Sequence, residues 1–280
     1  MMLATIYWGV DPILIQFGNF SIRYYSLCWL IGFALGYIVI DNIFIKEKIN
    51  RDIVGSLFVY VFVAALIGAR LGHCLFYDWN YFSQHPLEII LPITKTATGV
   101  KFTGYAGLAS HGGALGVMLA LFLFHKKYKL PFLSLLDKLA LVSPLAGGFI
   151  RIGNFFNSEI IGGPSSLPWA VVFGSVDNIP RHPAQLYEAI SYFIIFGILY
   201  LIYDKARHYH GFIFGLGLTL IFAARFVIEY CKEVQEQFEL SMRATIGMDM
   251  GQLLSIPFIL IGLSFIFFAL RKRKNKLLMD

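Results

Sequence analysis

Charged residues are scarce in this chain of 280 residues. Only 14% of the residues are charged, whereas 58% are hydrophobic and the mean hydropathy is +0.68. A chain with so little charge cannot cover a soluble domain of this size with polar side chains, so the composition excludes an ordinary soluble protein and favours a membrane protein. The 27 phenylalanines and 15 tyrosines agree, because phenylalanine suits a surface that faces lipid and tyrosine favours the headgroup region.

Cysteine is also scarce, with only Cys28, Cys74 and Cys231. Their number is odd, they lie far apart and they lack metal-ligand spacing, so neither a disulfide framework nor a zinc site is predicted. We expect all three to be packing residues. Internal repeats, low-complexity tracts and breaks in composition are lacking too, so we expect a single membrane-embedded domain over residues 1–280.

The beginning of the chain lacks the basic residues of a removable signal peptide. Residues 1–20 instead carry Asp11 and Pro12 before any long apolar run, which argues against such a signal. We place this opening segment on the outer surface and expect a short interfacial helix there.

Long apolar stretches, by contrast, are abundant. A helix needs roughly 20 apolar residues to cross roughly 30 Å of hydrocarbon, and about seven stretches meet this need. The sequence therefore predicts an all-α polytopic membrane protein with about seven transmembrane helices. The fourth stretch contains Asp137, Lys138 and Pro144, so we expect it to be short or kinked. The stretches are Leu27 to Ile45, Ile53 to Phe76, Tyr105 to Phe124, Phe132 to Ile150, Ala184 to Tyr203, Gly211 to Tyr230 and Leu253 to Leu270.

Lysine and arginine follow every second stretch, so they gather at one side of the membrane. Since such residues accumulate in cytoplasmic loops, we expect the N-terminus outside and the C-terminus in the cytoplasm. The net charge of +6 and the basic tail, residues 271–280, then belong to the cytoplasmic face and to anionic lipid, not to nucleic acid. The basic residues are Lys46, Lys48, Arg51, Lys126, Lys127, Lys129, Lys205, Arg207, Arg271, Lys272, Arg273, Lys274 and Lys276.

Two loops on the opposite side are long. Residues 78–104 and 151–183 both exceed the usual helix connection of roughly 2 to 8 residues. We therefore expect these external loops to fold over the outer face and to cover the functional site.

Polar residues within the apolar stretches carry the functional signal, because an arginine at a helix centre costs about 2.5 to 3.5 kcal/mol on insertion scales. Arg225 and Glu229 lie four residues apart on the sixth stretch, which places them on one helical face. Two interpretations stay open. The pair faces a polar cavity, or it is an ordinary ion pair near the interface, where arginine commonly extends its charge towards water.

A histidine followed by glycines opens the third stretch. His111 precedes Gly112, Gly113 and Gly116, and glycines at a helix start let backbone amides approach a phosphate. The alternative is structural, because Gly112 and Gly116 also have the spacing of ordinary packing between membrane helices.

The segment Arg151 to Gly162 is the most specific of all. Arg151, Asn154, Asn157 and Glu159 are crowded together and separated by phenylalanines and glycines, which a solvated loop does not need. An arginine beside amide and carboxylate groups suits a phosphate with neighbouring hydroxyls, because guanidinium offers a planar fork of donors. The segment predicts a headgroup-binding site.

The segment Arg181 to Glu188 leads into the fifth stretch. It is either a helix start opened by Pro183 or a further part of the site, and both interpretations stay open.

Together these motifs resemble the prolipoprotein diacylglyceryl transferase family. The family pattern begins with an Arg or His followed by Trp-Tyr-Gly-Leu. It then runs through Gly-Ala-Arg-Leu-Gly, His-Gly-Gly, Arg-x-Gly-Asn-Phe-x-Asn-x-Glu-x-x-Gly, Leu-Pro-Trp-Ala, His-Pro-x-Gln-Leu-Tyr-Glu and Arg-x-x-x-Glu in this order. The resemblance covers the chain from about Asp11 to Gln252. The matching segments are Arg23 to Leu27, Gly68 to Gly72, His111 to Gly113, Arg151 to Gly162, Leu167 to Ala170, His182 to Glu188 and Arg225 to Glu229.

Some positions depart from the family pattern. Ser158 stands where the family has a glycine between Asn and Glu, and Cys231 to Gln235 replace an aromatic residue followed by Arg-x-Pro-Asp. We expect these departures to alter the backbone around Glu159 and the loop after Glu229, without removing a charged site residue. The other departures are Tyr24, Ser26 and Ile150.

The resemblance implies a multi-pass enzyme of the bacterial inner membrane. Its implied reaction transfers the diacylglyceryl group of phosphatidylglycerol to the lipobox cysteine thiol of a prolipoprotein, forms a thioether and releases glycerol phosphate, as the first step of lipoprotein maturation. The implied partners are phosphatidylglycerol, prolipoprotein signal peptides and membrane lipid, with no nucleic acid, and the reaction needs no metal or organic cofactor.

The resemblance also implies roles for residues. Arg151 and Arg225 would hold the phosphate as its charge grows. His111 would either take the proton of the thiol, whose pKa is about 8.5, or bind the headgroup while the arginines favour the thiolate. The residues that would bind substrate are Tyr25, Asn154, Glu159, Gly162 and Glu229.

Two other classes of protein stay open. A polytopic transporter or flippase would also carry arginine and glutamate within the membrane, although broken helices and repeats are expected there. A haem-binding or structural membrane protein could use His73 and His111, but it would leave the Arg151 to Gly162 segment unexplained.

Overall fold

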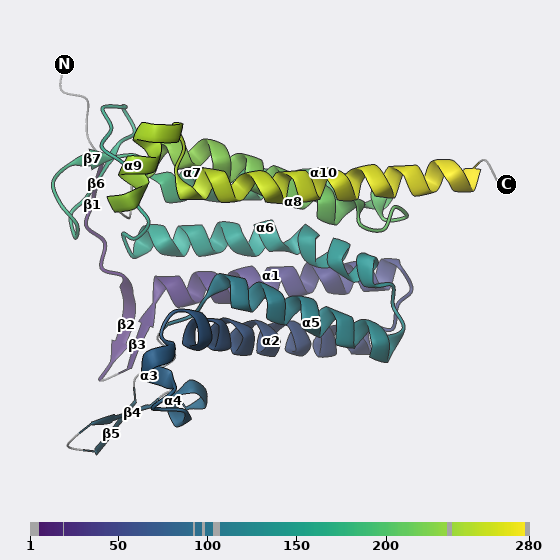
Figure 1. The fold of residues 1–280 in the computed structure, drawn as a ribbon, viewed down its shortest axis with the longest axis horizontal. Helices are drawn as coiled ribbons and strands as arrows, with labels where there is room; N and C mark the ends of the chain where they lie inside the picture. Colours follow the sequence, from purple (N-terminus) through teal and green to yellow (C-terminus); the bar gives the residue numbers. More distant parts are fainter. Residues whose placement is uncertain are drawn as a thin grey trace. The chain divides into compact units, whose positions relative to one another are not determined.

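The computed structural model describes residues 6–18, 20–91, 93–96, 99–102, 107–233 and 237–277. The described chain is mostly helical (Figure 1). It divides into two compact units. Unit 1 lies within residues 1–42 and 136–280, and unit 2 spans residues 43–135.

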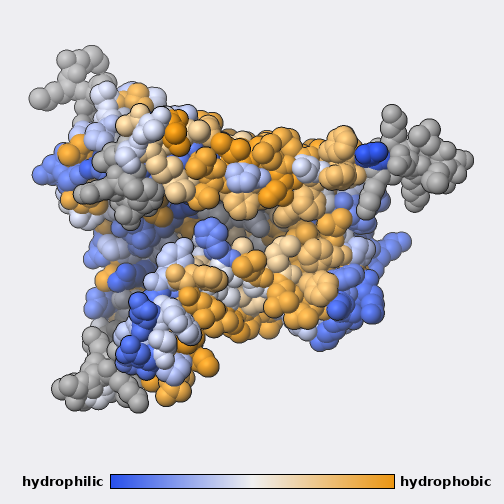
Figure 2. All heavy atoms as spheres, in the orientation of Figure 1, coloured by the Kyte–Doolittle hydropathy of each residue, from blue (hydrophilic) through white to orange (hydrophobic). Residues whose placement is uncertain are grey.

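Among the described residues, six helices are long and apolar enough to cross a membrane. Figure 2 shows hydrophobic side chains along the long helices, as a surface in contact with lipid requires. A polytopic membrane protein is therefore supported. The six helices are α1 (Tyr24–Lys46), α2 (Asp52–Phe76), α6 (Phe132–Phe156), α7 (Ala184–Ala206), α8 (Phe212–Ile228), which continues into η1 (Glu229–Cys231), and α10 (Met250–Leu277).

The third expected span is a helix as well, α5 (Ser110–Tyr128), but it is not among these six. Polar residues at both of its ends leave a short apolar centre. Within unit 2, α5 packs against α2 through glycines: a Cβ atom on Gly112 would collide with the carbonyl oxygen of Gly68, and one on Gly116 with that of Ala64. The packing interpretation of Gly112 and Gly116 is thus supported.

The fourth stretch is longer than expected. Helix α6 has 25 residues and continues through Pro144. Its Asp137 side chain is buried, with 2% exposure, and accepts hydrogen bonds from the backbone nitrogens of Gly211 (2.7 Å) and Phe214 (2.8 Å). Because the first amides of a helix have no partner within it, Asp137 caps the start of α8 and fixes the register of α6 against α8.

The opening segment is not a helix. Ile6–Trp8 forms β1 and Ile13–Phe17 forms β2, so the expectation of an interfacial helix is wrong, and residues 1–5 lie outside the described chain. Gly9 and Pro12 disfavour a helix in this segment. Gly18, with φ +56°, makes the turn into β3 (Phe20–Arg23). Strands β2 and β3 pair antiparallel.

The second expected external loop folds onto this opening segment. Its first residues belong to α6, and β6 (Val171–Phe173) and β7 (Pro180–Arg181) follow. The sheet has the order β1-β6-β7, with β1 parallel to β6 and β7 antiparallel. Phe155 and Phe173 form a small core under this sheet, and the ring of Trp8 packs 4.4 Å from that of Phe155. The all-α class thus holds for the long helices but not for these connecting segments.

In unit 2 the first expected loop also has structure of its own. It contains α3 (Trp79–Phe82), α4 (Leu87–Ile90) and an antiparallel hairpin of β4 (Ile93–Thr96) and β5 (Gly99–Phe102). Residues 92, 97–98 and 103–104 of this loop, and residues 278–280 of the basic tail, lie outside the described chain.

Candidate functional site

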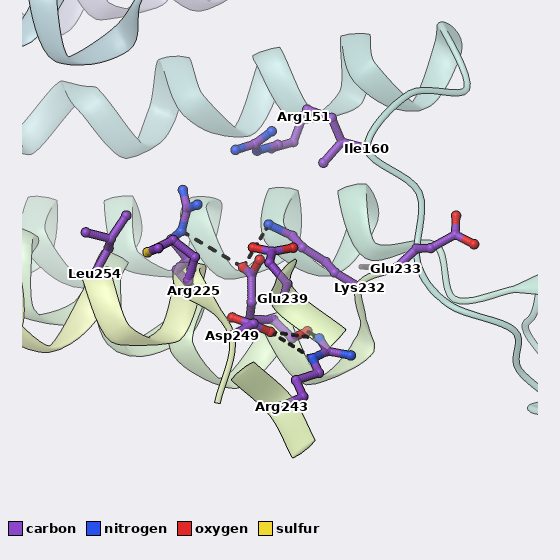
Figure 3. A pocket seen from close by; sticks show the side chains of 12 residues that line it. Arg151, Ile160, Arg225, Lys232, Glu233, Glu239, Arg243, Asp249 and Leu254 are labelled. Carbon is purple, nitrogen blue, oxygen red and sulfur yellow. Dashed lines mark hydrogen bonds and ion pairs between the residues drawn. The ribbon is translucent and has the colours of Figure 1, made fainter. Parts of the chain in front are cut away.

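A charged cavity of about 350 Å³ lies in unit 1 (Figure 3). Its walls come from the C-terminal end of α6, the end of α8, the segment after η1, helix α9 (Gln237–Ile246) and the first turns of α10. Figure 3 shows Arg151 facing Arg225 and Lys232 across this space. The charged residues of the wall are Arg151, Arg225, Glu229, Lys232, Glu233, Glu239, Arg243 and Asp249.

Arg151 is held in place by two partners. Its Nε lies 2.7 Å from Oε2 of Glu188, whose side chain on α7 is fully buried with 0% exposure. Its Nη1 donates a hydrogen bond to Oδ1 of Asn154, one turn further along α6, at 3.2 Å. A buried carboxylate requires a cation beside it, so Glu188 and Arg151 fix one another.

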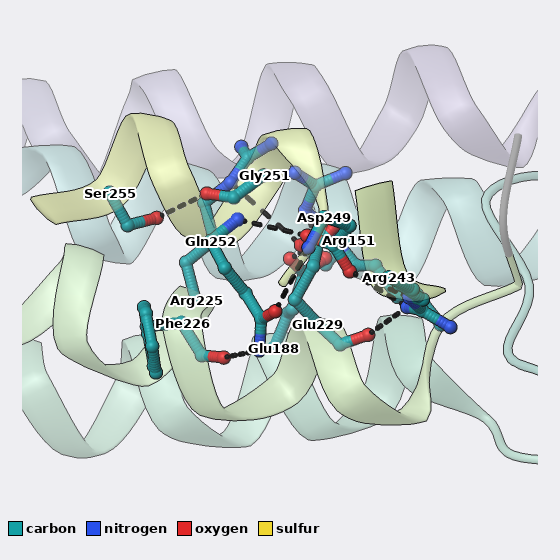
Figure 4. A network of polar contacts seen from close by, with 11 residues as sticks. Arg151, Glu188, Arg225, Phe226, Glu229, Arg243, Asp249, Gly251, Gln252 and Ser255 are labelled. Atoms are coloured by element: carbon teal, nitrogen blue, oxygen red, sulfur yellow. Dashed lines mark hydrogen bonds and ion pairs between the residues drawn. The ribbon is translucent and has the colours of Figure 1, made fainter. Parts of the chain in front are cut away.

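Lys232 connects this pair to the end of α8. Its Nζ lies 2.9 Å from Oε1 of Glu188 and 3.2 Å from Oε2 of Glu229. Arg225 Nε lies 4.0 Å from the same Glu229 oxygen, so the predicted i,i+4 pair exists but is loose. Together Arg151, Glu188, Lys232, Glu229 and Arg225 form an alternating chain of three cations and two carboxylates. Figure 4 shows Arg151, Glu188, Glu229 and Arg225, and Figure 3 shows Lys232. The guanidinium groups of Arg151 and Arg225 can donate charge-assisted hydrogen bonds to an anionic ligand in the cavity.

Arg243 joins three helices at the other wall of the cavity. Its Nη2 lies 2.7 Å from Oδ2 of Asp249 and donates to the backbone oxygen of Glu229 at 3.2 Å. Asp249 caps α10, because the backbone nitrogen of Gln252 donates to Oδ1 of Asp249 and the backbone nitrogen of Asp249 donates to Oε1 of Gln252. A Cβ atom on Gly251 would lie 2.5 Å from the Glu229 carboxyl group, so glycine makes room for that group.

Glu159 is oriented by amides from two helices. Asn154 Nδ2 donates to its Oε1 at 2.8 Å and Asn157 Nδ2 donates to the same oxygen at 3.2 Å. The backbone oxygen of Glu159 accepts from Nε2 of the buried Gln185 on α7. Through Asn154, the predicted residues Arg151 and Glu159 thus belong to one network.

The backbone beside Glu159 is unusual. Ser158 has φ +54° and Ile160 has φ +57°, in the left-handed region that favours glycine. Ser158 is the position at which the family pattern has a glycine. The departure therefore places serine, which lacks the conformational freedom of glycine, in a backbone conformation that favours glycine.

Gly162 acts through its backbone. Its nitrogen donates to the carbonyl oxygen of His182 at 3.0 Å, and it pairs as a β-bridge with Lys232. A Cβ atom here would lie 2.7 Å from the carbonyl oxygen of Cys231 and would also meet His182. A side chain at this position would therefore push Lys232 away from Glu188.

Arg181 stabilises the loop beside the cavity by contacts with three other residues. It contacts Asp177 (2.6 Å), Glu233 (2.9 Å) and the backbone oxygen of Gly162 (3.3 Å). The hydrogen bond from Arg181 holds the pKa of Asp177 below its usual 3.8. Pro183 stands at the N-cap of α7, so the segment from Arg181 to Glu188 is a helix start. It also supplies Glu188, the buried partner of Arg151.

Tyr25 lies in the first turn of α1 and packs against α6. A Cβ atom on Gly153 would lie 2.8 Å from Cδ2 of the tyrosine ring, so the ring covers the backbone between Arg151 and Asn154. His111 lies in unit 2 as the second residue of α5, with an exposed side chain. Its role in the site stays a prediction.

Several charged residues of the wall were not predicted. Lys232 has i,i+3 spacing to Glu229, and this local signal could have identified it. Asp249 and Gln252 have the spacing of a capping box before a long apolar stretch, which could have marked the start of α10. Nothing in the sequence indicates that Arg243 reaches Asp249.

No group of three or more His, Cys, Asp or Glu side chains in the described residues could hold a metal ion. Cys28 and Cys74 are buried, as expected of packing residues, whereas Cys231 is half-buried.

Comparison with known proteins agrees with these motifs. The family model described as prolipoprotein diacylglyceryl transferase matches residues 12–268. The chain is 48% identical to the phosphatidylglycerol–prolipoprotein diacylglyceryl transferase of Bacteroides fragilis over 98% of its own length and 99% of the relative. The proteins of the same name from Tolumonas auensis and Chloroherpeton thalassium are 43% and 38% identical, over 92% and 96% of this chain and 95% and 96% of theirs. The chain therefore belongs to the prolipoprotein diacylglyceryl transferase family.

Proposed function

We propose that this chain transfers the diacylglyceryl group of phosphatidylglycerol to the lipobox cysteine of prolipoproteins in the bacterial inner membrane, the first step of lipoprotein maturation. The names of its relatives support this activity. The observation that carries the proposal is the cavity that Arg151, Lys232 and Arg225 line, with Arg151 and Lys232 both paired to the buried Glu188. Family membership favours this transferase over a transporter or a haem protein.

In the proposed reaction the thiolate sulfur attacks the carbon of the diacylglyceryl group that carries the phosphate ester. A C–S bond forms, the C–O bond breaks, and its electron pair leaves with the phosphate oxygen as glycerol phosphate. Negative charge therefore grows on the phosphate. Cations that are already oriented in a site of low dielectric constant stabilise such charge without reorganisation.

The two arginines divide this task. Glu188 and Asn154 orient the guanidinium of Arg151 before substrate binds, so Arg151 is the fixed clamp. Arg225 is 37% exposed, and its Nε lies 4.0 Å from Glu229 Oε2, which is a loose ion pair. It can therefore turn to the phosphate at little cost. Tyr25, Asn154, Glu159 and Gly162 are proposed to shape the headgroup pocket around Arg151.

His111 is proposed to take the thiol proton. His111→Gln keeps a hydrogen-bonding side chain but loses the base, so its rate defect is expected to shrink as pH rises and the thiol ionises without help. A defect that is constant with pH in a folded variant would instead make His111 a headgroup ligand.

For the membrane topology we propose α5 as a seventh span, the N-terminus outside and the C-terminus in the cytoplasm, with both units in one transferase domain. Lysine and arginine placement supports this orientation. In a Cys231→Ser background, a membrane-impermeant thiol reagent should label Asn80→Cys in intact cells but not Asn275→Cys. Labelling of both from outside would contradict the orientation.

The activity is tested with purified protein, phosphatidylglycerol vesicles and a lipobox peptide. Mass spectrometry should show the peptide gaining one diacylglyceryl group as a thioether. The same peptide with serine in place of cysteine is the matched control and should stay unmodified. If folded protein leaves the cysteine peptide unchanged, the proposed function is wrong.

A further inference from the structure

Three polar side chains that follow η1 in the sequence reach back to the C-terminal end of α8 (Figure 4). They are Arg243 on α9, and Asp249 and Gln252 at the start of α10, and we call these three residues the clasp. Arg243 and Asp249 line the cavity, yet the proposed reaction does not use the clasp. Asp249 and Gln252 are only 2% and 1% exposed, so their partners lie inside the protein.

The clasp donates hydrogen bonds to backbone oxygens at the end of α8, where the last carbonyls of a helix have no partner within it. Arg243 Nη2 donates to the backbone oxygen of Glu229 at 3.2 Å, and Gln252 Nε2 donates to that of Phe226 at 3.3 Å. A cation at this point also interacts favourably with the negative end of the helix dipole. Helices α9 and α10 therefore fix where α8 ends and η1 begins.

Asp249 holds the guanidinium of Arg243 in place. Oδ2 of Asp249 lies 3.2 Å from Nε and 2.7 Å from Nη2 of the arginine. The hydrogen bonds with Gln252 at the start of α10 in turn hold Asp249. One nitrogen of Arg243, Nη2, thus meets both the Asp249 carboxylate and the Glu229 carbonyl.

The turn that begins at Glu229 carries charged side chains into the cavity. The backbone oxygen of Glu229 also accepts a hydrogen bond from the backbone nitrogen of Lys232 at 3.1 Å. Lys232 Nζ lies 2.9 Å from Oε1 of Glu188, and Oε2 of Glu188 contacts Arg151. A shift of this turn would therefore pass through Lys232 and Glu188 to the guanidinium of Arg151. A displacement of about 1 Å in a catalytic site can cost about 100-fold in rate.

We propose that Arg243 is a positioning residue for the transfer reaction, a role that rests on the proposed function. It acts through the Glu229 carbonyl on the turn that carries Lys232, and thereby on Arg151. The alternative is an ion pair with Asp249 that only stabilises the fold. The two roles differ in one consequence: a stabilising pair affects the rate only through the folded fraction, whereas a positioning residue affects the rate of molecules that are fully folded.

An Asp249→Ser background separates these roles in the whole protein. Serine keeps a capping oxygen for the backbone nitrogen of Gln252 but removes the carboxylate that pairs with Arg243. Adding Arg243→Met to this background then removes only the contact with Glu229. Thioether formation on a lipobox peptide is measured with phosphatidylglycerol vesicles, at a temperature at which circular dichroism shows every variant fully folded. The added substitution should lower kcat/KM at least about tenfold.

Two further variants complete the test. Arg243→Lys in the parent protein keeps a cation whose single nitrogen can meet both acceptors, so it should lose at most about one hydrogen bond, or about fivefold in kcat/KM. Ala244→Met is the matched control for methionine, because Ala244 is exposed beside Arg243 on α9. It should leave kcat/KM unchanged.

The outcomes separate this role from the proposed function. If Arg243→Met keeps kcat/KM within about twofold in the Asp249→Ser background, Arg243 only stabilises the fold and the positioning role is overturned, because even a neutral hydrogen bond contributes about that much. A folded parent protein that leaves the peptide unmodified would instead contradict the proposed function, and the positioning role with it.

Discussion

Replacement of Arg151 by lysine tests the phosphate clamp most directly. Lysine keeps the positive charge and can still meet Glu188, but it has no planar fork, so the bond from Arg151 Nη1 to Asn154 is lost. A hydrogen bond to a charged group contributes about 1.5 to 3 kcal/mol. Applied to the transition state, this loss lowers kcat/KM by about 10- to 150-fold.

The assay is the initial rate of thioether formation on a lipobox peptide, with phosphatidylglycerol varied. Arg271→Lys is the matched control, since Arg271 is exposed and lies about five turns along α10 from the cavity. It should leave kcat/KM unchanged. An Arg151→Lys variant that folds and keeps kcat/KM within about twofold of the parent would refute the clamp, because even a neutral hydrogen bond contributes about that much.

Three further outcomes are expected. Gly251→Ala brings a Cβ atom to 2.5 Å from the Glu229 carboxyl group, so it should displace that carboxyl group from Lys232 and lower kcat/KM; an unchanged kcat/KM would contradict the contact. Ser158→Gly relieves a left-handed backbone that costs about 1 to 2 kcal/mol, offset in part by the entropy of glycine, so Tm in detergent should rise. Because Arg181 lowers the pKa of Asp177, their pairing stabilises the fold above about pH 4 and is lost as pH falls further; Asp177→Asn should therefore remove part of the acid dependence of Tm, and identical pH profiles would count against the pairing.

The long helices could be predicted because a stretch of roughly 20 apolar residues in lipid has few other ways to satisfy its backbone. Helix ends were less predictable, since α6 continues from Ile150 to Phe156 through polar residues that the apolar pattern excludes. The opening strands could not be foreseen. Strand β1 exists because Ile6 pairs with Val171, far along the chain, and a local pattern contains no information about such a partner.

In the candidate site, too, some contacts follow from local sequence and others depend on tertiary structure. Arg225 and Glu229 share a helical face, so their spacing predicted their contact. The pairing of Lys232 with Glu188 depends on where η1 meets α7, and that is a property of tertiary structure. Family motifs identified Arg151 and its neighbours but not the second wall around Arg243.

The hydrogen bonds that Asp137 accepts at the start of α8 determine at which level along α6 and α8 the two arginines of the site lie. Arg151 lies 14 residues after Asp137 on α6, and Arg225 lies 14 residues after Gly211, the residue that Asp137 caps. At 1.5 Å per residue, both arginines stand about 21 Å from their common starting point. One extra residue within α8 would shift Arg225 by about 1.5 Å and turn it by about 100°. A hydrogen bond at one end of two helices thus sets the level at which two arginines meet a ligand at the other end.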